Sequence, residues 1–497
     1  MSAFIGVDVG TGGARALAVD ESGEVLAEAS AEYSLYSPYP GWSEQDPADW
    51  WRATREVLGR VTREAEEEIV GLGLTGQQHG SVFLDAGDGV IRRALLWNDQ
   101  RTATQAREIS EKVGEKRLVG IAGSYPITAV TASKILWLRD EEPENFGRVS
   151  HVLLPKDYVR LLLTGEYATD ASDASGTLLL DVRSRDWSSE LLDACEVPRG
   201  WMPRVYEGPE STGTLREEVA GELGLPAGIP VAGGGGDNAA AAVGIGIVEE
   251  GLVSSSVGTS GVLFAHADDF EPDPSGRLHA FCHSVPGAYH FMGVTQSAGG
   301  SLSWWSETVG KGFEELVEVA SAVEPGAEGL MFLPYLAGER TPHLDPRARG
   351  AFVGLTGRHG LGHMTRALME GVVFSLNESL EIMRELGLPV EEVRAVGGGA
   401  RSALWRQLQA DIYEEPIRRT EVDEGPAYGA ALLGGAAAGT YRDIEEACSV
   451  VKLRDEVTAP DPEHSRIYDE YYEVYRSLYP AQKDAMHRLL DLANEHG

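Results

Sequence analysis

Two glycine–threonine turns of nearly the same sequence lie about half a chain apart, and this repeat limits the folds open to the chain. Residues 9–13 read VGTGG and residues 257–261 read VGTSG. Strand-like apolar segments flank each turn, so each is predicted to join two strands of a hairpin. A chance similarity between two hairpin turns is the alternative. The spacing within 497 residues favours a duplicated architecture with two related halves.

Between and after these turns, strand-like runs alternate with segments of helical periodicity. A helix is predicted over about residues 50–68, because Asp46 followed by Pro47 is a typical helix start. A strand is expected over residues 69–74. This alternation indicates an α/β protein. Further helices are predicted over residues 364–386, 402–413 and 463–492.

No Ser/Pro-rich linker separates the two halves, so we expect two closely packed domains with a hinge. The boundary is placed near residues 244–251, just before the second Gly-Thr turn. This gives an N-terminal domain of residues 1–245 and a C-terminal domain of residues 246–497 that ends in a helical extension. The tyrosines of that extension are predicted to be packing contacts: Tyr468, Tyr471, Tyr472 and Tyr475.

The composition limits the partners of the chain. Its formal net charge is −36, and such a surface repels the phosphate backbone of nucleic acids. The N-terminal segment does not resemble a signal peptide, and no run of about 18 apolar residues predicts a membrane span. Three widely spaced cysteines indicate reduced thiols. We therefore expect a cytoplasmic protein without nucleic-acid or membrane partners, and a homodimer is left open.

Four consecutive glycines at residues 233–236 are the strongest sign of a binding site. Asp237, Asn238 and an alanine run follow them, which reads as a strand, an open turn and the start of a helix. Asp237 acting only as a helix cap is the alternative. Because each glycine loses conformational entropy on folding, four would be a costly way to begin a helix. We favour a ligand that approaches this backbone, with Asp237 ionised at the positive end of the helix.

Other glycine-containing segments suit related chemistry. Asp8 precedes the first turn, where it could hold Mg²⁺ directly or through water while backbone N–H groups bind phosphate. Residues 396–402, VGGGARS, suit a nucleoside or phosphate at a helix start, and residues 297–301, SAGGS, are a weaker example. Residues 76–80, GQQHG, follow an apolar strand and suit recognition of hydroxyl groups.

Two familiar nucleotide sites are rejected on the sequence. No G-x-x-x-x-G-K-S/T phosphate loop occurs. Residues 71–76 match the G-x-G-x-x-G pattern of dinucleotide-binding folds, but residues 79–97 are predicted to form a strand, a turn and a strand. Because that pattern requires a helix at this point, a Rossmann site is not expected.

The order of these motifs resembles that of the FGGY carbohydrate kinases, from about Phe4 to about Gly439. Within that family, the members that phosphorylate D-xylulose are the most similar. Many short segments carry the resemblance, so it is more specific than any single motif. They are residues 8–13, 42–47, 76–80, 96–101, 154–158, 172–177, 236–238, 258–260 and 397–400.

The resemblance implies two actin-like, RNase H-like domains with a central cleft. It implies transfer of the γ-phosphoryl group of ATP to O5 of D-xylulose with Mg²⁺, with Asp237 as the catalytic base and Asp8 as the catalytic residue at the Mg²⁺–phosphate end. The sugar would contact Gln78, His79, Asp237 and Asn238. The nucleotide and its phosphates would contact Thr11, Gly12, Gly13, Gly258, Thr259, Gly300, Gly398, Gly399 and Ser402.

Two residues depart from the family pattern and leave the exact pentulose open. Gly12 stands where serine is more common, and Gln78 stands where bacterial D-xylulose kinases more often carry methionine. An FGGY kinase for ribulose, a deoxysugar or glycerol is the main rival, against which residues 76–80 and 155–158 favour D-xylulose. A non-catalytic actin-fold sugar sensor is less favoured, because both predicted catalytic aspartates are present and no DNA-binding segment is evident.

Overall fold

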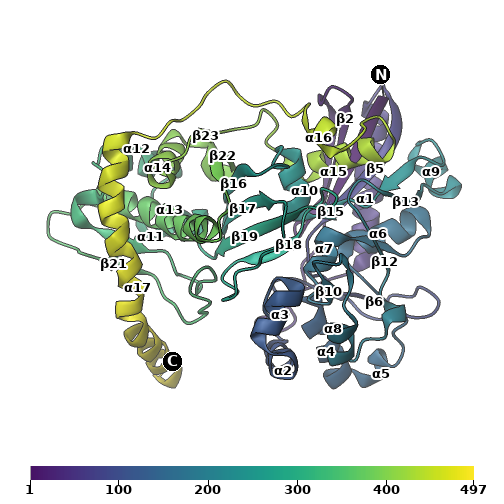
Figure 1. Ribbon diagram of the computed structural model, residues 1–497, viewed down its shortest axis with the longest axis horizontal. Coiled ribbons are helices and arrows are strands. Elements are labelled where there is room, and N and C mark those ends of the chain that lie inside the picture. Colours follow the sequence, from purple (N-terminus) through teal and green to yellow (C-terminus); the bar gives the residue numbers. More distant parts are fainter. Residues whose placement is uncertain (1, 497) are drawn as a thin grey trace.

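The computed structural model describes residues 2–496 and contains one large sheet in each half of the chain (Figure 1). The first sheet has the order β13-β14-β5-β1-β2-β3, with β15 paired to β5, and the second has the order β18-β19-β17-β16-β22-β23. The strands of the first sheet are β1 (Ser2–Val9), β2 (Gly13–Asp20), β3 (Val25–Glu32), β5 (Glu68–Gly76), β13 (Ser211–Thr214), β14 (Pro230–Ala232) and β15 (Gly235–Gly236). Those of the second are β16 (Gly251–Val257), β17 (Gly261–Ala267), β18 (His279–Cys282), β19 (Tyr289–Thr295), β22 (Val390–Val396) and β23 (Ile417–Arg418).

The two sheets repeat one topology. Strand β1 pairs antiparallel with β2 and parallel with β5, and β16 pairs antiparallel with β17 and parallel with β22. The order β3-β2-β1-β5-β14 in the first sheet therefore corresponds to β19-β17-β16-β22-β23 in the second. Each Gly-Thr turn connects the first two strands of its repeat. The predicted α/β fold with two duplicated, actin-like halves is confirmed.

Amphipathic helices cover the sheets where the periodicity predicts them. Helix α1 (Pro47–Glu64) packs on the first sheet and buries Trp50 and Val57 completely. It begins at Pro47, because the Asp46 side chain accepts a hydrogen bond from the Ala48 N–H at 3.0 Å and thereby caps the first turn. The other long helices also match their predictions: α13 (Leu361–Glu385) on the second sheet, α14 (Ala403–Tyr413) and α17 (Pro462–His496).

Helix α15 (Gly425–Ala437) lies in the second half of the sequence but packs against β1 and β5 of the first sheet (Figure 1). Glycines make this close packing possible: a Cβ on Gly73 would lie 1.7 Å from the Ala430 carbonyl oxygen. On its other side, α15 packs against α10 (Asp237–Gly244), where a Cβ on Gly429 would lie 1.8 Å from the Ala240 oxygen. The pair α10 and α15 therefore joins the two halves directly behind Asp237.

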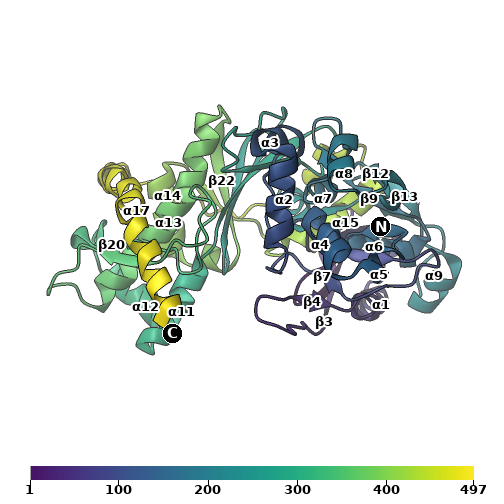
Figure 2. The ribbon, with the colours of Figure 1, turned by 90° about the horizontal axis from the view of Figure 1, so that it is seen from below.

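The C-terminal helix α17 runs along the outer edge of the second half (Figures 1 and 2). It is held by tyrosines, as predicted: Tyr468 and Tyr475 are buried against Phe374 of α13. The Tyr468 hydroxyl donates to the Glu370 carboxylate at 2.8 Å. Across residues 2–496, no helix combines the length and apolar character needed to cross a bilayer.

The smaller helices of residues 103–146 form the lower part of the first half, and those of residues 155–175 lie above them, closer to the first sheet (Figure 1). Two of them, α6 (Pro155–Thr164) and α7 (Ala171–Ser175), lie directly behind the glycine turn that precedes Asp237. The remaining helices of this region are α2 (Ala103–Val113), α3 (Glu115–Ala122), α4 (Thr131–Glu141) and α5 (Pro143–Phe146).

Candidate active site

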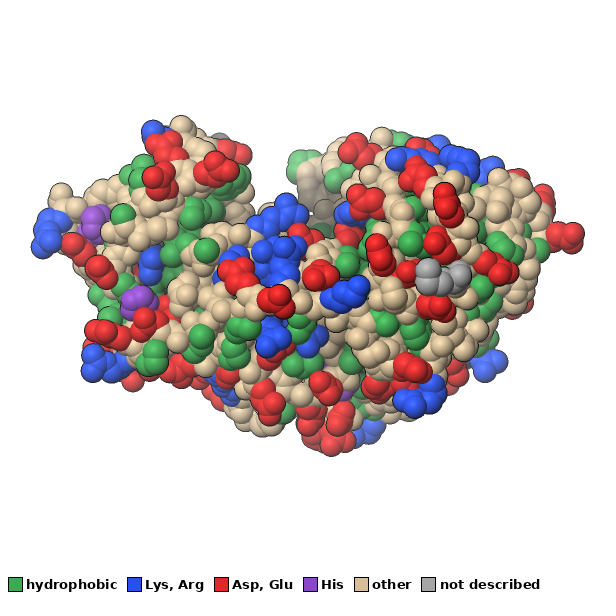
Figure 3. Space-filling model, turned by 90° about the horizontal axis from the view of Figure 1, so that it is seen from above, with side chains coloured by type: hydrophobic (Ala, Val, Ile, Leu, Met, Phe, Trp, Pro, Cys, Tyr) green, Lys and Arg blue, Asp and Glu red, His purple; other side chains and the backbone are tan. Residues whose placement is uncertain are grey.

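The molecule is hollowed between its two halves (Figure 3), and seven of the predicted site residues line two cavities. The Asp237 cavity, of about 300 Å³, lies between the start of α10 and the second sheet, and Asp237, Asn238 and Glu424 are among its lining residues. The Trp405 cavity, of about 440 Å³, lies in the second half of the chain. Five predicted nucleotide contacts line the Trp405 cavity: Gly258, Thr259, Gly398, Gly399 and Ser402.

Asp237 is the first residue of α10, and its two carboxylate oxygens differ in their hydrogen bonding. Oδ1 accepts hydrogen bonds from the Asn238 backbone N–H at 2.8 Å and from Asn238 Nδ2 at 2.9 Å. Oδ2 receives none from the residues that the structure describes. Burial raises the pKa of Asp237 to about 6, while the two hydrogen bonds from Asn238 oppose the shift. At pH 7 this carboxylate is therefore mostly ionised, with one oxygen open to a ligand.

Asp8 lies at the end of β1, immediately before the first Gly-Thr turn. Its Oδ1 atom is buried and accepts no hydrogen bond from residues 2–496. Burial, followed by the negative charges of Asp237 and Glu424, raises the pKa of Asp8 to about 8, against the opposing charge of Arg15. Burying an unpaired carboxylate beside two other acids is energetically unfavourable without a ligand, and a bound cation would offset this cost.

The first Gly-Thr turn is held by two side chains and one backbone N–H group from three other segments. Trp97 Nε1 donates to Thr11 Oγ1 at 2.9 Å, Gln45 Nε2 donates to the Thr11 carbonyl at 2.7 Å, and the Gln77 N–H donates to the Val9 carbonyl at 3.0 Å. Residues 11–13 remain half-buried or exposed, so Thr11, Gly12 and Gly13 are accessible to a ligand. These hydrogen bonds therefore fix the turn, while residues 11–13 remain accessible to a ligand.

The 76–80 loop orients two of the predicted sugar contacts. His79 adopts the left-handed conformation with φ of 66°, and its carbonyl accepts hydrogen bonds from Lys134 Nζ at 2.7 Å and Thr131 Oγ1 at 3.2 Å. Its Nδ1 atom lies 2.6 Å from the Gly176 carbonyl, so Nδ1 carries the proton and Nε2 is an acceptor. Burial, and then the charge of Lys134, lowers the pKa of His79 to about 3, so the ring is neutral.

Gln78 lies closer to the glycine turn before Asp237. Its Nε2 donates to the Ser172 carbonyl at 3.3 Å, and the side chain is only 6% exposed. A Cβ on Gly236 would lie 2.3 Å from Gln78 Nε2, which explains why glycine directly precedes Asp237. The structure therefore brings Gln78 and Asp237 to the same part of the first half.

The second Gly-Thr turn is built against the start of α11 (Gly299–Val309). The N–H groups of Gly299 and Gly300 donate to the carbonyls of Gly258 at 2.7 Å and Thr259 at 3.0 Å. A Cβ on Gly299 would lie 2.6 Å from the Gly258 oxygen, so these glycines are required by close packing. Because the Gly300 N–H is already used, any contribution of this residue to a nucleotide is through its small size. Apolar side chains complete the Trp405 cavity: Leu302, Phe313, Val317 and Trp405.

Three residues beside the site had no predicted role: Arg15, Trp97 and Glu424. Glu424 forms an ion pair with Arg15, and its charge acts on Asp8. Trp97 is 39% exposed beside Thr11, although residues 96–101 were part of the family resemblance. No sequence motif pointed to Glu424, because it lies 409 positions from Arg15 and only the packing of α15 brings them together.

Residues 155–158 carry part of the family resemblance but are not among the predicted sugar contacts. The side chains of Lys156 and Asp157 are completely buried and pair with each other at 2.6 Å. They cannot contact a sugar in the cleft. They lie in α6, whose Arg160 contacts the Ala232 and Gly233 carbonyls of the glycine turn before Asp237.

Two repeats of one sheet topology, each with a Gly-Thr turn, and two carboxylates beside the first turn define a phosphotransferase of the actin-like fold. Comparison with known families agrees with this class. The N-terminal domain model of the FGGY family of carbohydrate kinases matches residues 3–244, and the C-terminal domain model of the family matches residues 253–438. The chain therefore belongs to the FGGY family of carbohydrate kinases.

Individual relatives cover nearly the whole chain. It is 42% identical to the xylulose kinase of Escherichia coli over 96% of this chain and 98% of that one. The solved xylulose kinase of Rhodospirillum rubrum is 31% identical, with a TM-score of 0.91 over 98% of this chain and 100% of that one. The solved gluconate kinase of Lactobacillus acidophilus is 25% identical, with a TM-score of 0.93 over 98% and 99%. One fold therefore accommodates different sugar acceptors in these relatives.

Proposed function

We propose that the chain transfers the γ-phosphoryl group of ATP to O5 of D-xylulose, with Asp237 as the general base. The observation that carries the proposal is the position of the Asp237 carboxylate. Asn238 occupies Oδ1, Oδ2 is open, and Gln78 of the 76–80 loop lies beside the preceding glycine. The relatives named as xylulose kinases, at 38–42% identity over nearly their full length, support D-xylulose as the acceptor.

The reaction needs one base and accurate positioning. Asp237 Oδ2 accepts the proton of the sugar hydroxyl as the sugar oxygen bonds to the γ-phosphorus atom. The bond from that phosphorus to the β–γ bridging oxygen breaks, and ADP leaves with the electron pair. A carboxylate with a pKa of about 6 is a sufficient base, because the hydroxyl loses its proton late in a loose transition state. The neutral His79 ring offers Nε2 to a second hydroxyl, which orients the sugar.

The residues around Asp8 fit a magnesium ion. Asp8 Oδ1 is buried without a hydrogen bond, and no cluster of three His, Cys, Asp or Glu side chains among residues 2–496 would form a complete protein-made metal site. Magnesium commonly takes one or two carboxylates and completes its shell with water and phosphate oxygens. We infer that Asp8 would hold Mg²⁺, directly or through water. When bound, the ion would neutralise charge on the phosphates.

We assign the two substrates to different parts of the chain. Residues 1–245 supply the sugar contacts and the first phosphate turn, and residues 246–497 supply the nucleotide contacts. The polar 76–80 loop and Asp237 support the first assignment. The Trp405 cavity supports the second, since an apolar wall beside glycine backbone suits a nucleobase with its attached phosphates.

A substrate screen tests the proposal. ADP release is measured with D-xylulose, D-ribulose, a deoxysugar, glycerol and gluconate at saturating Mg-ATP, and phosphorus NMR identifies the phosphorylated position. We expect the highest kcat/KM for D-xylulose, with the phosphate on O5. A higher kcat/KM for another acceptor would transfer the assignment to that sugar. Binding of a sugar without any ADP release would instead support the sugar-sensor alternative.

A further inference from the structure

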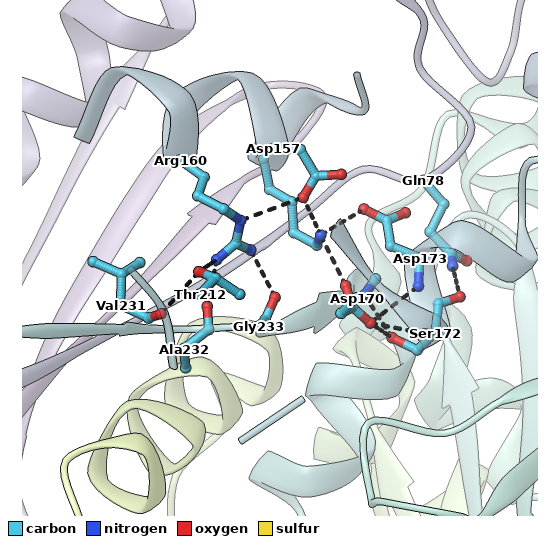
Figure 4. A network of polar contacts seen from close by, with 12 residues as sticks. Gln78, Asp157, Arg160, Asp170, Ser172, Asp173, Thr212, Val231, Ala232 and Gly233 are labelled. Carbon is cyan, nitrogen blue, oxygen red and sulfur yellow. Dashed lines mark hydrogen bonds and ion pairs between the residues drawn. The ribbon is translucent and has the colours of Figure 1, made fainter. Parts of the chain in front are cut away.

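Two segments of the family resemblance have no part in the proposed chemistry, although both lie close to it. They are residues 155–158 in α6 and residues 172–177 around α7. Their buried side chains meet in one group of charges, which we call the α6 ion cluster and define as Lys156, Asp157, Arg160, Asp170 and Asp173 (Figure 4). All five side chains are completely buried.

Lys156 is the centre of the α6 ion cluster. Its Nζ atom lies 2.6 Å from Asp157 Oδ1, 2.8 Å from Asp170 Oδ1 and 3.2 Å from Asp173 Oδ2. Burial acts to lower the pKa of Lys156, but the three carboxylates together raise it, so the lysine stays charged. Burying such a cluster costs free energy, and removing one of its members strongly destabilises the folded protein. Stability alone therefore does not explain why these charges are buried here.

The cluster reaches the glycine turn before Asp237 along two routes. On one side, the Arg160 guanidinium donates to the carbonyls of Ala232 and Gly233, the latter at 2.6 Å, where β14 ends (Figure 4). On the other side, Asp170 Oδ2 accepts hydrogen bonds from the Ser172 N–H, at 2.8 Å, and from the Ser172 hydroxyl. The Ser172 hydroxyl oxygen in turn accepts the Gly236 N–H at 3.1 Å.

Ser172 also holds the loop that faces the sugar. Its carbonyl accepts the hydrogen bond from Gln78 Nε2 at 3.3 Å (Figure 4). Ser172 thus has two roles. Its hydroxyl fixes the Gly236 backbone directly before Asp237, and its carbonyl holds Gln78, a predicted sugar contact. The glycine turn has no side chains of its own to hold it, and Gly234 has φ of 74°, so its geometry depends on such outside contacts.

We propose that Ser172, together with Arg160 and Asp170 of the α6 ion cluster, is a positioning device for the catalytic carboxylate. In this proposal Arg160, Asp170 and Ser172 fix both ends of the 233–236 turn and thereby the direction of the Asp237 side chain. The proposal rests on the base role proposed for Asp237. It assigns to residues 155–158 and 172–177 a function in turnover rather than in sugar recognition.

Asp170 and Asp173 differ in their contacts, which provides a matched test. Both carboxyl groups lie beside Lys156, but only Asp170 accepts hydrogen bonds from Ser172, and the Asp173 side-chain oxygens accept none from the described residues. Burial raises the pKa of Asp173 well above its usual range, although Lys156 opposes the shift. Asp170→Asn changes the group that holds Ser172, whereas Asp173→Asn leaves that contact in place.

The experiment compares Ser172→Ala, Asp170→Asn and Asp173→Asn, all close in size to the native residues. We expect Ser172→Ala and Asp170→Asn to lower kcat for D-xylulose about 10- to 100-fold, the scale of a small misplacement of a catalytic group. The KM for ATP should not change, and thermal unfolding should show folded proteins. Asp173→Asn should keep kcat within about twofold, because it leaves the hydrogen bonds of Ser172 and Arg160 to the turn in place.

A double-mutant cycle separates positioning from general structural damage. If Ser172 acts through Asp237, adding Ser172→Ala to Asp237→Asn should produce no further loss of kcat. An equal loss in both backgrounds would overturn the proposal, as would wild-type kcat in Ser172→Ala or an Asp173→Asn as impaired as Asp170→Asn. These failures are distinguishable from failure of the base role, which would be seen as near-normal turnover in Asp237→Asn alone.

Discussion

The two halves of the molecule share a topology but differ in the chemistry of equivalent positions. Asp8 precedes the first Gly-Thr turn at the end of β1, and Ser256 occupies the corresponding place before the second turn in β16. Three acids line the Asp237 cavity, Asp237 from the first half and Asp423 and Glu424 from the second, whereas no Asp or Glu of the described chain is among the residues that line the Trp405 cavity.

We infer that the duplicated fold divides the reaction between its halves. The first half supplies Asp8, Asp237 and a fixed polar network, and Glu424 joins them from the second half of the sequence. The Trp405 cavity of the second half offers glycine backbone and an apolar wall, which suit binding without chemistry. If the division is correct, substitutions in the first half should reduce turnover, and those in the second should mainly change the affinity for ATP.

The largest expected effect is that of Asp237→Asn, which should lower kcat by about 10²-fold or more while D-xylulose still binds. The amide keeps the size and the contact with Asn238 but cannot accept the proton. Steady-state kinetics with calorimetric measurement of sugar binding checks both parts. Loss of binding with unchanged kcat would remove Asp237 from the base role.

The same carboxylate should set the acid limb of the pH profile. The base must be ionised, and burial raises the pKa of Asp237 to about 6. In wild type, kcat should therefore rise with pH through about 6 and become flat above about 7. His79 titrates far below this range, so a limb near pH 6 would not belong to it. A profile flat down to pH 5 would contradict the assignment.

Asp8→Asn should reduce activity about 10- to 100-fold and raise the Mg²⁺ concentration needed for half-maximal activity. Ser256→Ala is the matched control in the other repeat.

The stability of the metal-free protein offers a second readout. Because the pKa of Asp8 is about 8 when folded and about 3.8 in the ordinary state, the native protein binds more protons than the unfolded one between these values. This acid therefore lowers stability as pH rises from about 4 to about 8.

The sign of that linkage predicts a stabilised variant. Without Mg²⁺, Asp8→Asn should melt a few degrees above wild type at pH 8 and show no such gain at pH 4, where both forms are neutral. Differential scanning calorimetry at the two pH values measures this. An equal shift at both values would show that burial of the charge is not the cause.

The sequence predicted much of this fold because the relevant signals are local. The repeated turn, the Asp46–Pro47 helix start and the periodicity of α13 each depend on residues close in the chain. The packing of α15 on the first sheet could not be predicted in this way, because it depends on distant glycines such as Gly73. For the same reason Glu424, which reaches the site only through that packing, was missed.

The candidate site shows the same limit. Motifs predicted which segments meet at the cleft, because each combines glycines with a polar residue. They did not predict which polar residues face it: Asn238 and Lys156 are both polar and lie in motifs, but Asn238 lines the Asp237 cavity and Lys156 is completely buried in the α6 ion cluster. Burial of a charge depends on partners such as Asp170, and these are brought to it only by the folded chain.

A smaller effect is expected from His79→Ala, which should raise the KM for D-xylulose about tenfold and leave the KM for ATP unchanged. The substitution removes one acceptor, Nε2, from the sugar side only. Because the ring is neutral in the folded protein, the KM for D-xylulose should also be independent of His79 ionisation between pH 5 and 8. A change confined to ATP would place the sugar elsewhere.

The smallest effects come from adding a side chain to each turn region. A Cβ on Gly299 would meet the Gly258 oxygen at 2.6 Å, so Gly299→Ala must displace the second turn and should raise the KM for ATP severalfold. A Cβ on Gly12 would meet no heavy atom of the described chain within 4 Å, so Gly12→Ser should change either KM by less than about twofold. If Gly12→Ser were instead the more damaging variant, phosphate would have to lie closer to the first turn than to the second, and the nucleotide would no longer belong mainly to the second half.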